Sequence, residues 1–467
     1  MFNRGIGRTR LWLPVIASAL VIIVGGGFYN SPMAGDEKTY QSLKLFSEVL
    51  EEIEANYVDS VDSDKLIQSA IKGMVSSLDP HSTFMPPEAF DELQDDTKGE
   101  FGGIGIVISM KDGLLVVVSP IEGTPAYRAG IMAGDVIVKI DGESTRDMEL
   151  WESVKRMRGP TGDDVVLTVV RPGAPDPLEY ILKRDIIPME SVRSTTLKPG
   201  YGYLWITNFR ANTAEDVEKA LAELESHDVP LKGLVMDLRN NPGGLLNQAN
   251  DVSDLFLERG TIVSIKGRLE QHTEVFEAHP SQTLRAYPLV VLINGGSASA
   301  SEIVAGALQD HGRALILGTT SFGKGSVQSV KPLKEGFGLK YTIARYYTPN
   351  GRSIQAEGIK PDIIVPFSLI EDKEEQASET AFDRLVREKD LKNHLEPETP
   401  GKKSEKKNEN DPGTLIQDQN QEIEPVPGQG MISLDRLNHD AQVQRALEIL
   451  ISYGVFSTLN KSMAGTN

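Results

Sequence analysis

The 467-residue sequence contains no cysteine, which excludes disulfide bonds, thiolate nucleophiles and cysteine-ligated zinc. Basic residues are also few, since 48 Lys and Arg stand against 67 Asp and Glu, giving a formal net charge of −19. Binding to nucleic acid needs clustered positive charge, so this balance argues against such a partner and is most simply explained by solubility. The chain exceeds the size of one ordinary core, and we expect roughly two or three folded units joined by linkers.

A long apolar run, LWLPVIASALVIIVGGGF, occupies residues 11–28 and follows three arginines in the first ten residues. It is long enough for the core of a signal peptide or for a single membrane anchor. Pro32 stands where a cleavage site before Gly35 would favour a small residue, so a signal-anchor is an equal alternative. We expect residues 1–36 to be a signal peptide or signal-anchor. The rest of the chain would then lie in the cell envelope, periplasmic or extracytoplasmic, anchored to the inner membrane by residues 11–28 if uncleaved.

Residues 37–98 have the apolar periodicity of helices. The stretches SLKLFSEVLEEIEANYV and DSDKLIQSAIKGMVSSLD each place apolar side chains on one broad face. Such faces are expected to pack against another surface. The prolines of DPHSTFMPP end this helical region, and His81 within it is interpreted as a hydrogen-bonded turn residue.

Residues 99–185 change to short β segments separated by glycine turns. The stretches FGGIGI, TPAYRAGI and GDVIVKIDG, in this order, resemble a PDZ domain. The resemblance implies that a peptide adds as a strand beside the first apolar strand, with its terminal carboxylate on N–H groups of the preceding loop, Phe101 to Gly105. The alternative is that the glycines only form a turn. The candidate peptide-binding residues are Phe101, Gly102, Gly103, Ile104, Gly105 and Ile106.

Arg158, in the stretch RGPTG that follows the helical segment of this domain, is a candidate gate residue acting on a neighbouring element. A solvated arginine is the alternative interpretation.

Residues 186–367 alternate strand and helix patterns. GYGYLWITNF and LKGLVMDLRN predict strands, while TAEDVEKALAELESHD predicts a capped amphipathic helix between them. This alternation predicts an α/β core with a mainly parallel sheet, in which ligands gather where strands end in loops. The whole chain is therefore expected to be a mixed α/β, multidomain protein with a helical N-terminal part and an inserted PDZ-like β domain.

The stretch GTTSFGKGSVQ, residues 318–328, begins like the phosphate-binding pattern G-x-x-x-x-G-K. A phosphate loop needs Ser or Thr after the lysine and then a helix N-terminus. Here Gly325 follows Lys324, and SVQSVKPL predicts a strand ending at Pro332. The pattern therefore does not indicate a nucleotide site.

A second chemical motif follows the predicted strand LVVLI at residues 289–293. The small residues of NGGSASAS allow a tight turn that exposes a hydroxyl above a helix N-terminus, where unpaired N–H groups can stabilise an oxyanion. His311 lies at the far end of the same helix, so it is poorly placed as the base. Lys324 can serve instead if burial keeps its amine neutral, which is the Ser-Lys form of nucleophilic catalysis.

These motifs, with DLRNNPGG upstream and YTPNGRSIQAEGIKPDI downstream, resemble the carboxyl-terminal processing (tail-specific) proteases over roughly residues 42–367. The resemblance implies that Ser299 is the nucleophile, Lys324 the general base and Gln328 the third member that orients the lysine. Spacing alone does not separate Ser299 from Ser297 and Ser301.

The same resemblance implies an oxyanion hole formed by the N–H of Ala300 with that of Gly243 or Gly244. Asp310 is a candidate for a charge-relay role, with a structural carboxylate at a helix end as the alternative. No metal and no cofactor are implied.

The predicted function is a serine endopeptidase that recognises polypeptide C-termini through its PDZ domain and cleaves near them through an acyl-enzyme. Its expected partners are polypeptides with exposed C-termini, the membrane if the N-terminal segment stays uncleaved, and a second copy or an adaptor protein. The alternatives are a non-catalytic PDZ scaffold or chaperone of the cell envelope, and a Ser-His hydrolase that uses His311 or His81.

Residues 368–432 are dominated by charged residues, Pro, Gln and Asn, which predicts a flexible, largely disordered linker without chemistry. Residues 433–467 regain a helical apolar face at Val443, Leu447 and Leu450. This face is expected to dock on the core, with self-association as the alternative.

Overall fold

The computed structural model describes residues 36–111, 113–146, 148–280, 285–368, 387–391, 393–395 and 433–464. The chain divides into two compact units, residues 1–74 and 75–467. The apolar run at residues 11–28 lies outside the described residues. Among the helices that are described, none combines the length and apolar character needed to cross a bilayer.

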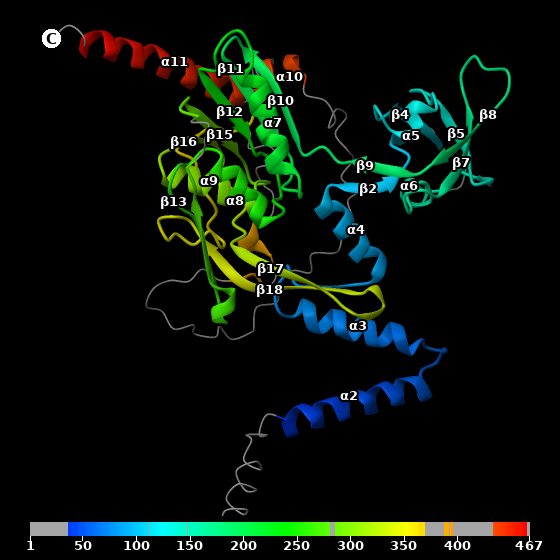
Figure 1. Ribbon diagram of the computed structural model, residues 1–467. Coiled ribbons are helices and arrows are strands. Elements are labelled where there is room, and N and C mark those ends of the chain that lie inside the picture. The colour runs from blue at the N-terminus through cyan, green and yellow to red at the C-terminus, as the bar shows by residue number, and fades with distance from the viewer. Residues whose placement is uncertain are drawn as a thin grey trace, which may run out of the picture. The chain divides into compact units, whose positions relative to one another are not determined.

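The first unit contains α2 (Asp36–Asn56) and most of α3 (Ser63–Ser76), as the periodicity predicts (Figure 1). The side chain of Asp62 accepts the N–H groups of Asp64 and Lys65, which caps the start of α3. The apolar face of α2 was expected to be packed, but its Leu43 and Leu45 are 61% and 60% exposed. Among the residues described in its own unit, this face of α2 is left without an apolar partner.

The PDZ segment forms an antiparallel sheet in the order β3-β4-β5-β7-β8. Alternate residues of β7 point inward, so Val165, Leu167 and Val169 are fully buried in the core of this domain. In the described part of the chain β3 pairs with β4 alone, which leaves β3 at the sheet edge. The elements are β3 (Ile106–Lys111), β4 (Leu114–Pro120), α5 (Pro125–Arg128), β5 (Val136–Ile140), β6 (Glu143–Ser144), α6 (Leu150–Met157), β7 (Asp164–Val170) and β8 (Leu178–Lys183).

The two chain connections of this domain pair with each other, as β2 (Glu100–Gly103) and β9 (Asp185–Pro188). The expected carboxylate-binding loop over residues 101–105 is therefore wrong for its first three residues. Phe101, Gly102 and Gly103 are strand residues, because their backbone lies in antiparallel register with residues 185–187. Only Ile104 and Gly105 form the loop before β3.

The protease core is built on a six-stranded sheet in the order β10-β11-β12-β15-β16-β19. All neighbouring strands are parallel except β10 and β11, which confirms the mainly parallel sheet. Every residue of β12 and β15 is buried, which accounts for their continuous apolar sequences. The strands are β10 (Val192–Lys198), β11 (Tyr201–Ile206), β12 (Gly233–Asp237), β15 (Leu289–Ile293), β16 (Ala314–Gly318) and β19 (Ile363–Ile364).

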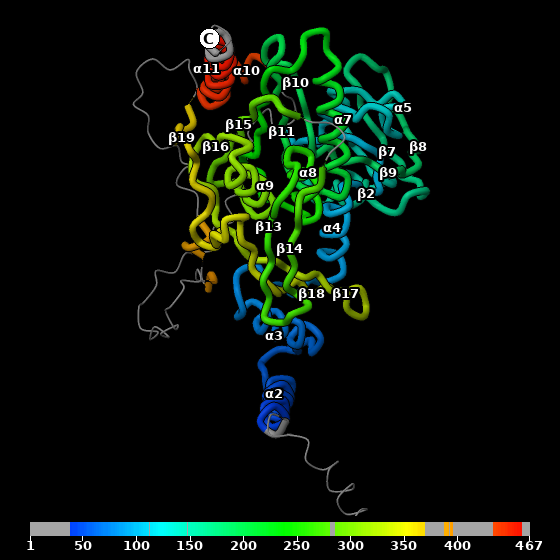
Figure 2. The backbone as a smooth tube through the Cα atoms, turned by 60° about the vertical axis from the view of Figure 1, so that its left-hand side comes forward, coloured from blue at the N-terminus to red at the C-terminus, as the bar shows by residue number. Residues whose placement is uncertain are grey.

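Helices cover both faces of this sheet. α7 (Thr213–Glu225), α8 (Leu246–Asp254) and α9 (Ala300–Asp310) bury their apolar side chains in one cluster with residues such as Leu234 and Met236. α10 (Leu434–His439) and α11 (Ala441–Ala464) pack on the opposite face (Figure 2). Val443 and Leu450 contact that face and are almost fully buried, so the C-terminal helix docks on the core as expected.

A second, wholly antiparallel sheet was not anticipated from the sequence. It has the order β1-β18-β13-β14, and β17 pairs with β18 along residues 338–345. β17 coincides with the strand predicted to end at Pro332, and α4 (Pro87–Lys98) follows β1. The strands are β1 (Thr83–Met85), β13 (Gly260–Gly267), β14 (Glu274–Ala278), β17 (Ser326–Pro332) and β18 (Gly338–Tyr347), and the 3-10 turns are η3 (Glu270–His272), η4 (Lys334–Gly336) and η5 (Glu388–Asp390).

The expected linker, residues 368–432, contains one stretch that packs on the core. Residues 387–391 form η5 with its flanks, and the side chain of Glu388 is fully buried. The expectation of a flexible linker is therefore not met at this stretch, because Glu388 finds polar partners that no local sequence pattern reveals.

Candidate active site

Ser299 lies in the turn between β15 and α9, at the N-cap of the helix. Its backbone angles, φ 54° and ψ −112°, fall outside the regions that L-residues normally occupy. A conformation of this kind costs about 1–3 kcal/mol and persists only where the surrounding structure imposes it. The turn thus presents Ser299 in a strained geometry, as nucleophile turns between a strand and a helix commonly do.

The three serines of SASAS have different environments. Ser297 and Ser301 are fully buried, and their hydroxyls donate to the carbonyls of Leu238 and Asn241 at 2.7 and 2.9 Å. Ser299 is only partly buried, and it alone of the three has a positive φ. Ser297 and Ser301 therefore hold the turn in place, while Ser299 is the one of the three whose side chain is not fully buried.

Lys324 lies in the loop between β16 and β17. Burial lowers the pKa of its amine, and the nearby charge of Lys340 lowers it further, against the opposing effect of three carboxylates, Glu388, Glu302 and Asp79. Gly325 is required here because a Cβ at this position would lie 2.6 Å from the backbone nitrogen of Gln355. The glycine that excluded a phosphate loop therefore lets the lysine loop pack closely against the segment carrying Gln355.

Glu302 connects the serine turn to the lysine loop. Its Oε2 accepts the backbone N–H of Ser299 at 2.8 Å and that of Lys324 at 2.9 Å. Its Oε1 accepts the Ser321 hydroxyl at 2.5 Å and the Gly323 N–H at 2.8 Å. Burial raises the pKa of Glu302 to about 7, although these hydrogen bonds favour the ionised form. One fully buried carboxylate thus fixes the two loops side by side.

Tyr346, on β18, makes a second connection between the same two loops. Its hydroxyl donates to the carbonyl of Lys324 and also lies within hydrogen-bonding reach of the Ser299 side chain. Burial raises the pKa of this phenol well above its usual value, so it stays protonated. The Ser299 hydroxyl and the Lys324 backbone therefore meet at one tyrosine.

The turn after β12 lies directly against the serine. A Cβ on Gly243 would come within 2.8 Å of the Ser299 Cβ and 3.0 Å of the Ala300 nitrogen, so only glycine allows this approach. The Gly243 N–H donates to Asn241 Oδ1 at 2.9 Å and is already used. Of the two predicted glycines, Gly244 is therefore the better oxyanion donor, together with Ala300 in the first turn of α9.

The structure places the two remaining candidates as follows. The side-chain amide of Gln328 donates to Ser326 Oγ at 2.9 Å and lies 3.5 Å from Thr342 Oγ1. Asp310, at the last turn of α9, pairs with Arg352 and accepts the Asn350 N–H at 2.9 Å. Asp310 is thus a structural carboxylate at the end of the helix that the serine begins, about 15 Å along its axis.

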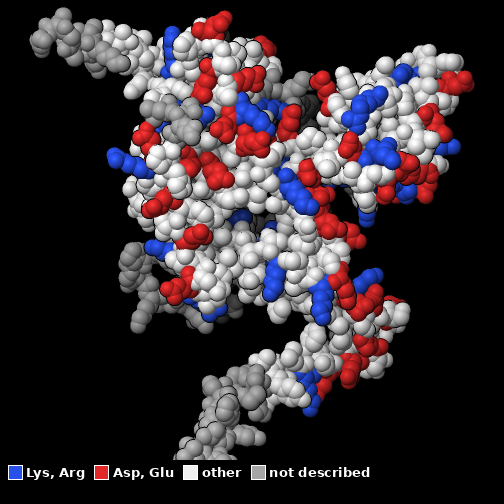
Figure 3. All heavy atoms as spheres, in the orientation of Figure 1, with Lys and Arg blue, Asp and Glu red and all other residues white. Residues whose placement is uncertain are grey.

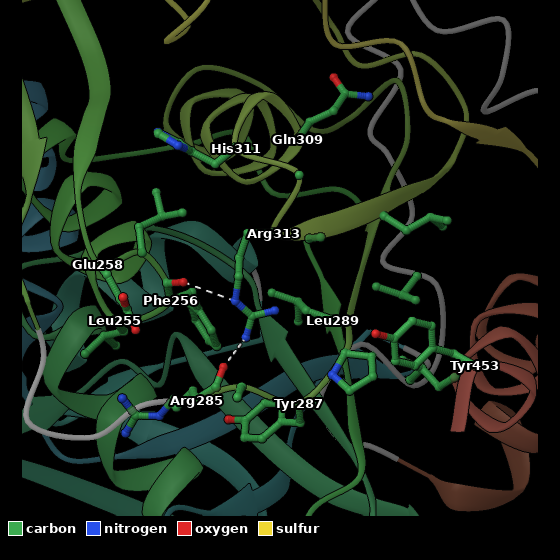
Figure 4. A pocket seen from close by; sticks show the side chains of 18 of the residues that line it. Leu255, Phe256, Glu258, Arg285, Tyr287, Leu289, Gln309, His311, Arg313 and Tyr453 are labelled. Atoms are coloured by element: carbon green, nitrogen blue, oxygen red, sulfur yellow. Dashed lines mark hydrogen bonds between the residues drawn. The ribbon is translucent and has the colours of Figure 1, made fainter. Parts of the chain in front are cut away.

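His311 is equally distant from the serine and has another role. Its Nε2 bonds the carbonyl of Thr261 at 2.7 Å. It lines a cavity of about 800 Å³ beside the C-terminal end of α9, where Arg313 donates to the carbonyls of Phe256 and Arg285 (Figure 4). This cavity lies at the opposite end of α9 from Ser299, and a Ser-His pair using His311 is not formed.

A buried ionic cluster at the end of β12 was not predicted from the sequence. Arg239 pairs with Asp237 on one side and donates to Asp440 Oδ2 at 2.8 Å and to Gln442 Oε1 at 2.7 Å on the other. Tyr203 donates to the same Asp237 at 2.7 Å. The cluster joins the end of β12 to the start of α11. Its only local signal was the pair of charges in DLR at the end of an apolar strand.

Glu302 was also missed, although its spacing from Ser299 is the S-x-x-E pattern of a capping box. Glu388 and Tyr346 could not have been found from local sequence, because their partners lie far away in the chain.

The PDZ segment offers an edge for a peptide. The exposed edge of β3 begins at Ile106, and α6 contributes the partly exposed Leu150. The guanidinium of Arg158 stacks on the ring of Phe101 at 4.1 Å, and its Nε is buried without a partner among the described atoms. Arg158 is therefore placed at the connection between this domain and the rest of the unit and is not a solvated arginine.

Charged side chains are distributed without a dominant sign on the face shown in Figure 3, where Lys and Arg are interspersed with Asp and Glu.

The chain resembles known proteases over most of its length. Residues 200–365 match Peptidase family S41, residues 116–171 match a PDZ domain, and residues 29–89 match the N-terminal domain described as that of the activating protease CtpB. A carboxy-terminal-processing protease of Bartonella bacilliformis is 45% identical over 82% of this chain and 86% of its own length. The carboxy-terminal processing protease CtpA of Bacillus subtilis is 37% identical over 75% of this chain and 74% of its own. The chain therefore belongs to the carboxy-terminal-processing proteases, the PDZ-containing serine peptidases of family S41.

Proposed function

We propose that this chain cleaves polypeptides near their C-termini with Ser299 as the nucleophile and neutral Lys324 as the general base. The lysine amine takes the proton of the Ser299 hydroxyl as Oγ attacks the substrate carbonyl carbon. The resulting oxyanion is stabilised by the N–H groups of Ala300 and Gly244. The ammonium of Lys324 then protonates the leaving amine, which breaks the C–N bond and leaves an acyl-enzyme.

The second half of the reaction uses the same groups. Lys324, again neutral, takes a proton from water as the water oxygen attacks the acyl-enzyme, and it returns that proton to Ser299 Oγ. Gln328 belongs to this proposal as the residue that orients the amine, since it lies on the strand that begins just after Lys324.

The observation that best supports the assignment is the pair of hydrogen bonds from Ser299 and Lys324 to one oxygen of Glu302. They hold a strained serine and a lysine of lowered pKa in adjacent loops, although 24 residues separate the two in sequence.

The test is cleavage of an unstructured polypeptide with an apolar C-terminus by purified variants. Ser299→Ala and Lys324→Ala are expected to lose activity by several orders of magnitude, whereas His311→Ala should retain it. Full activity of the lysine variant would disprove the mechanism, and loss of activity in the histidine variant with an intact fold would favour the Ser-His alternative.

The PDZ domain is proposed to capture the substrate's terminal carboxylate on the loop of Ile104 and Gly105, with the peptide backbone added to β3 at Ile106. It is further proposed to gate the protease, with Arg158 in its stack on Phe101 as the gate residue. Support comes from the open edge of β3 and from the insertion of the domain between α4 and the core. Deletion of residues 99–184, or Arg158→Ala, should change cleavage rate or tail preference. Unchanged values for both would rule out gating.

The location is proposed to be the cell envelope, with residues 11–28 either removed as a signal peptide or retained as an inner-membrane anchor. The basis is the sequence alone, an apolar run behind three arginines. Fractionation of cells producing the full chain, with N-terminal sequencing of the product, would distinguish these outcomes, and recovery from the cytoplasm would contradict both.

Self-association is proposed for the exposed apolar face of α2, with an adaptor protein as the alternative occupant. Light scattering of the chain with Leu43 and Leu45 replaced by serine should show a smaller particle than the parent chain. If the parent chain is already monomeric and the substituted chain has the same mass, the result would favour an adaptor protein.

A further inference from the structure

The short stretch 387–391 touches the lysine loop although it follows the protease core in sequence. The backbone N–H of Glu388 approaches the carbonyl of Phe322 at 3.4 Å. The turn is closed by its own hydrogen bonds, from Leu391 N–H to the Glu388 carbonyl at 3.1 Å and from Arg387 N–H to Asp390 Oδ2 at 2.9 Å. It is therefore a formed turn seated beside residue 322, two positions before the lysine.

The side chain of Glu388 reaches the other side of the lysine through a glutamine. Glu388 Oε1 accepts the amide N–H of Gln355 at 2.9 Å, and Gln355 Oε1 accepts the backbone N–H of Gly325 at 3.0 Å. Both side chains are fully buried. Glu388 thus contacts Phe322 directly and Gly325 through Gln355, and these two loop residues lie on either side of Lys324 in sequence.

The second carboxylate oxygen of Glu388 is held by the turn that precedes β1. His81 Nε2 lies 2.6 Å from Glu388 Oε2. The His81 backbone is itself fixed by Asp79, whose other oxygen accepts the Ser82 hydroxyl at 2.8 Å. Glu388 therefore joins three distant parts of the chain, residues 79–82, the lysine loop and the segment of Gln355, around one buried carboxylate.

From this geometry we propose that Glu388 is a positioning residue for the catalytic lysine. Glu388 holds the loop on both sides of Lys324 and places a negative charge near its amine. The proposal rests on the assignment of Lys324 as the general base. It assigns a role in catalysis to a stretch of the C-terminal linker that no family match covers, since the core match ends at residue 365.

The charges that face Lys324 come from four elements: Lys340 on β18, Glu388 on η5, Glu302 on α9 and Asp79 in the turn before β1. The carboxylates raise the pKa of the amine, whereas the ammonium of Lys340 lowers it. Glu388 thus has two separable effects, the position of the loop and the pH at which the lysine becomes neutral.

Glu388→Gln separates these effects. The glutamine oxygen can accept from Gln355, and its NH2 can donate to His81 Nε2 when the imidazole proton is on Nδ1, so both contacts survive without the charge. Glu388→Ala removes contacts and charge together. Lys340→Gln is the control of opposite sign, and Lys389→Gln is the matched control, because Lys389 is exposed in the same turn.

The experiment measures kcat and KM for peptide cleavage across pH with the full chain, after circular dichroism has shown that each variant is folded. The acid limb of the kcat/KM profile reports the free enzyme's base. Glu388→Gln should move this limb to lower pH, Lys340→Gln should move it to higher pH, and Lys389→Gln should leave it in place. Glu388→Ala should lower kcat about tenfold to a hundredfold with little change in KM.

A Glu388→Gln profile with the acid limb in its original place, while Lys340→Gln moves it, would overturn the proposal and leave Glu388 as a structural contact only. Two other results would show that the underlying assignment fails. If Lys324→Ala retains activity, or if neither charge variant moves the acid limb, Lys324 is not the base.

Discussion

Replacing Glu302 by glutamine tests the carboxylate that holds the serine turn and the lysine loop together. Glu302 accepts four hydrogen bonds, two at each oxygen, and all four donors lie in the serine turn or the lysine loop. An amide can accept at only one of the two positions. If its NH2 replaces Oε1, the Ser321 hydroxyl can turn to accept, but the N–H of Gly323 loses its acceptor.

One buried N–H without an acceptor costs about 1–3 kcal/mol, so the free energy of unfolding should fall by at least that amount. The opposite amide orientation would leave the N–H groups of Ser299 and Lys324 unpaired and cost about twice as much. Either arrangement shifts a catalytic loop, and kcat/KM should fall by about tenfold or more.

Glu302→Gln should also change how stability depends on pH. Burial raises the pKa of Glu302 to about 7, above its unfolded value, so the folded state binds this proton more tightly than the unfolded state. The associated stabilisation, about 3 kcal/mol, is fully present below the unfolded pKa and is lost as pH rises through about 7. The stability difference between parent and variant should therefore shrink as pH rises across this range.

Urea unfolding followed by fluorescence, at several values of pH, measures these quantities, and peptide cleavage measures the rate. The control is Glu218→Gln, because Glu218 is exposed on α7 and its replacement should change stability by less than about 0.5 kcal/mol. If Glu302→Gln were as stable and as active as the Glu218 variant, the proposed role of the carboxylate would be wrong.

Three further outcomes are expected. Gly325→Ala should lower stability by about 1–3 kcal/mol and lower kcat, because its Cβ would meet the backbone of Gln355, whereas Gly295→Ala, whose Cβ meets nothing within 4 Å, should not. Asp440→Ala should cost about 3–5 kcal/mol in urea unfolding because it strips the buried Arg239 of a partner, and exposed Asp435→Ala is the control. Activity of the parent should rise with pH through the lowered pKa of Lys324, and a profile flat from pH 5 to 10 would contradict a lysine base.

The parts of the fold that sequence could predict are those specified by local pattern. β12 and β15 are short apolar runs bounded by turn residues, and the structure has strands there because both faces of the sheet are covered by helices. The strand that follows the lysine loop was also predicted from local pattern, since the residues after Gly325 form β17 and not a helix.

The choice among three serines in one turn could not be made from spacing. Ser297, Ser299 and Ser301 alternate with alanines, and only the backbone angles and the hydroxyl partners distinguish them. Likewise, Gly243 and Gly244 are adjacent and chemically identical, and the side chain of Asn241 decides which N–H remains for an oxyanion. These details depend on contacts between segments that are distant in sequence.

The second sheet and the buried carboxylates show the same limit on a larger scale. β1 follows DPHS in sequence and pairs with β18, more than 250 residues later, which brings Ser82 to the backbone of Thr342 at 3.2 Å. No periodicity in either segment specifies that pairing. A pattern reveals which residues prefer a strand, whereas the partner strand is selected by the packing of the complete unit.

The catalytic turn and the lysine loop are therefore held by contributions from outside the segment that matches the peptidase family, residues 200–365. The turn at residues 79–82 contacts Glu388, which contacts Gln355 beside the lysine loop, and Asp440 contacts Arg239 just after β12. Glu388 and Asp440 are buried carboxylates with partners in the core, and burial of such a charge is favourable only when the partner is present. Formation of the candidate site is thus tied to folding of the second unit, in which Glu388 and Asp440 both contact the core.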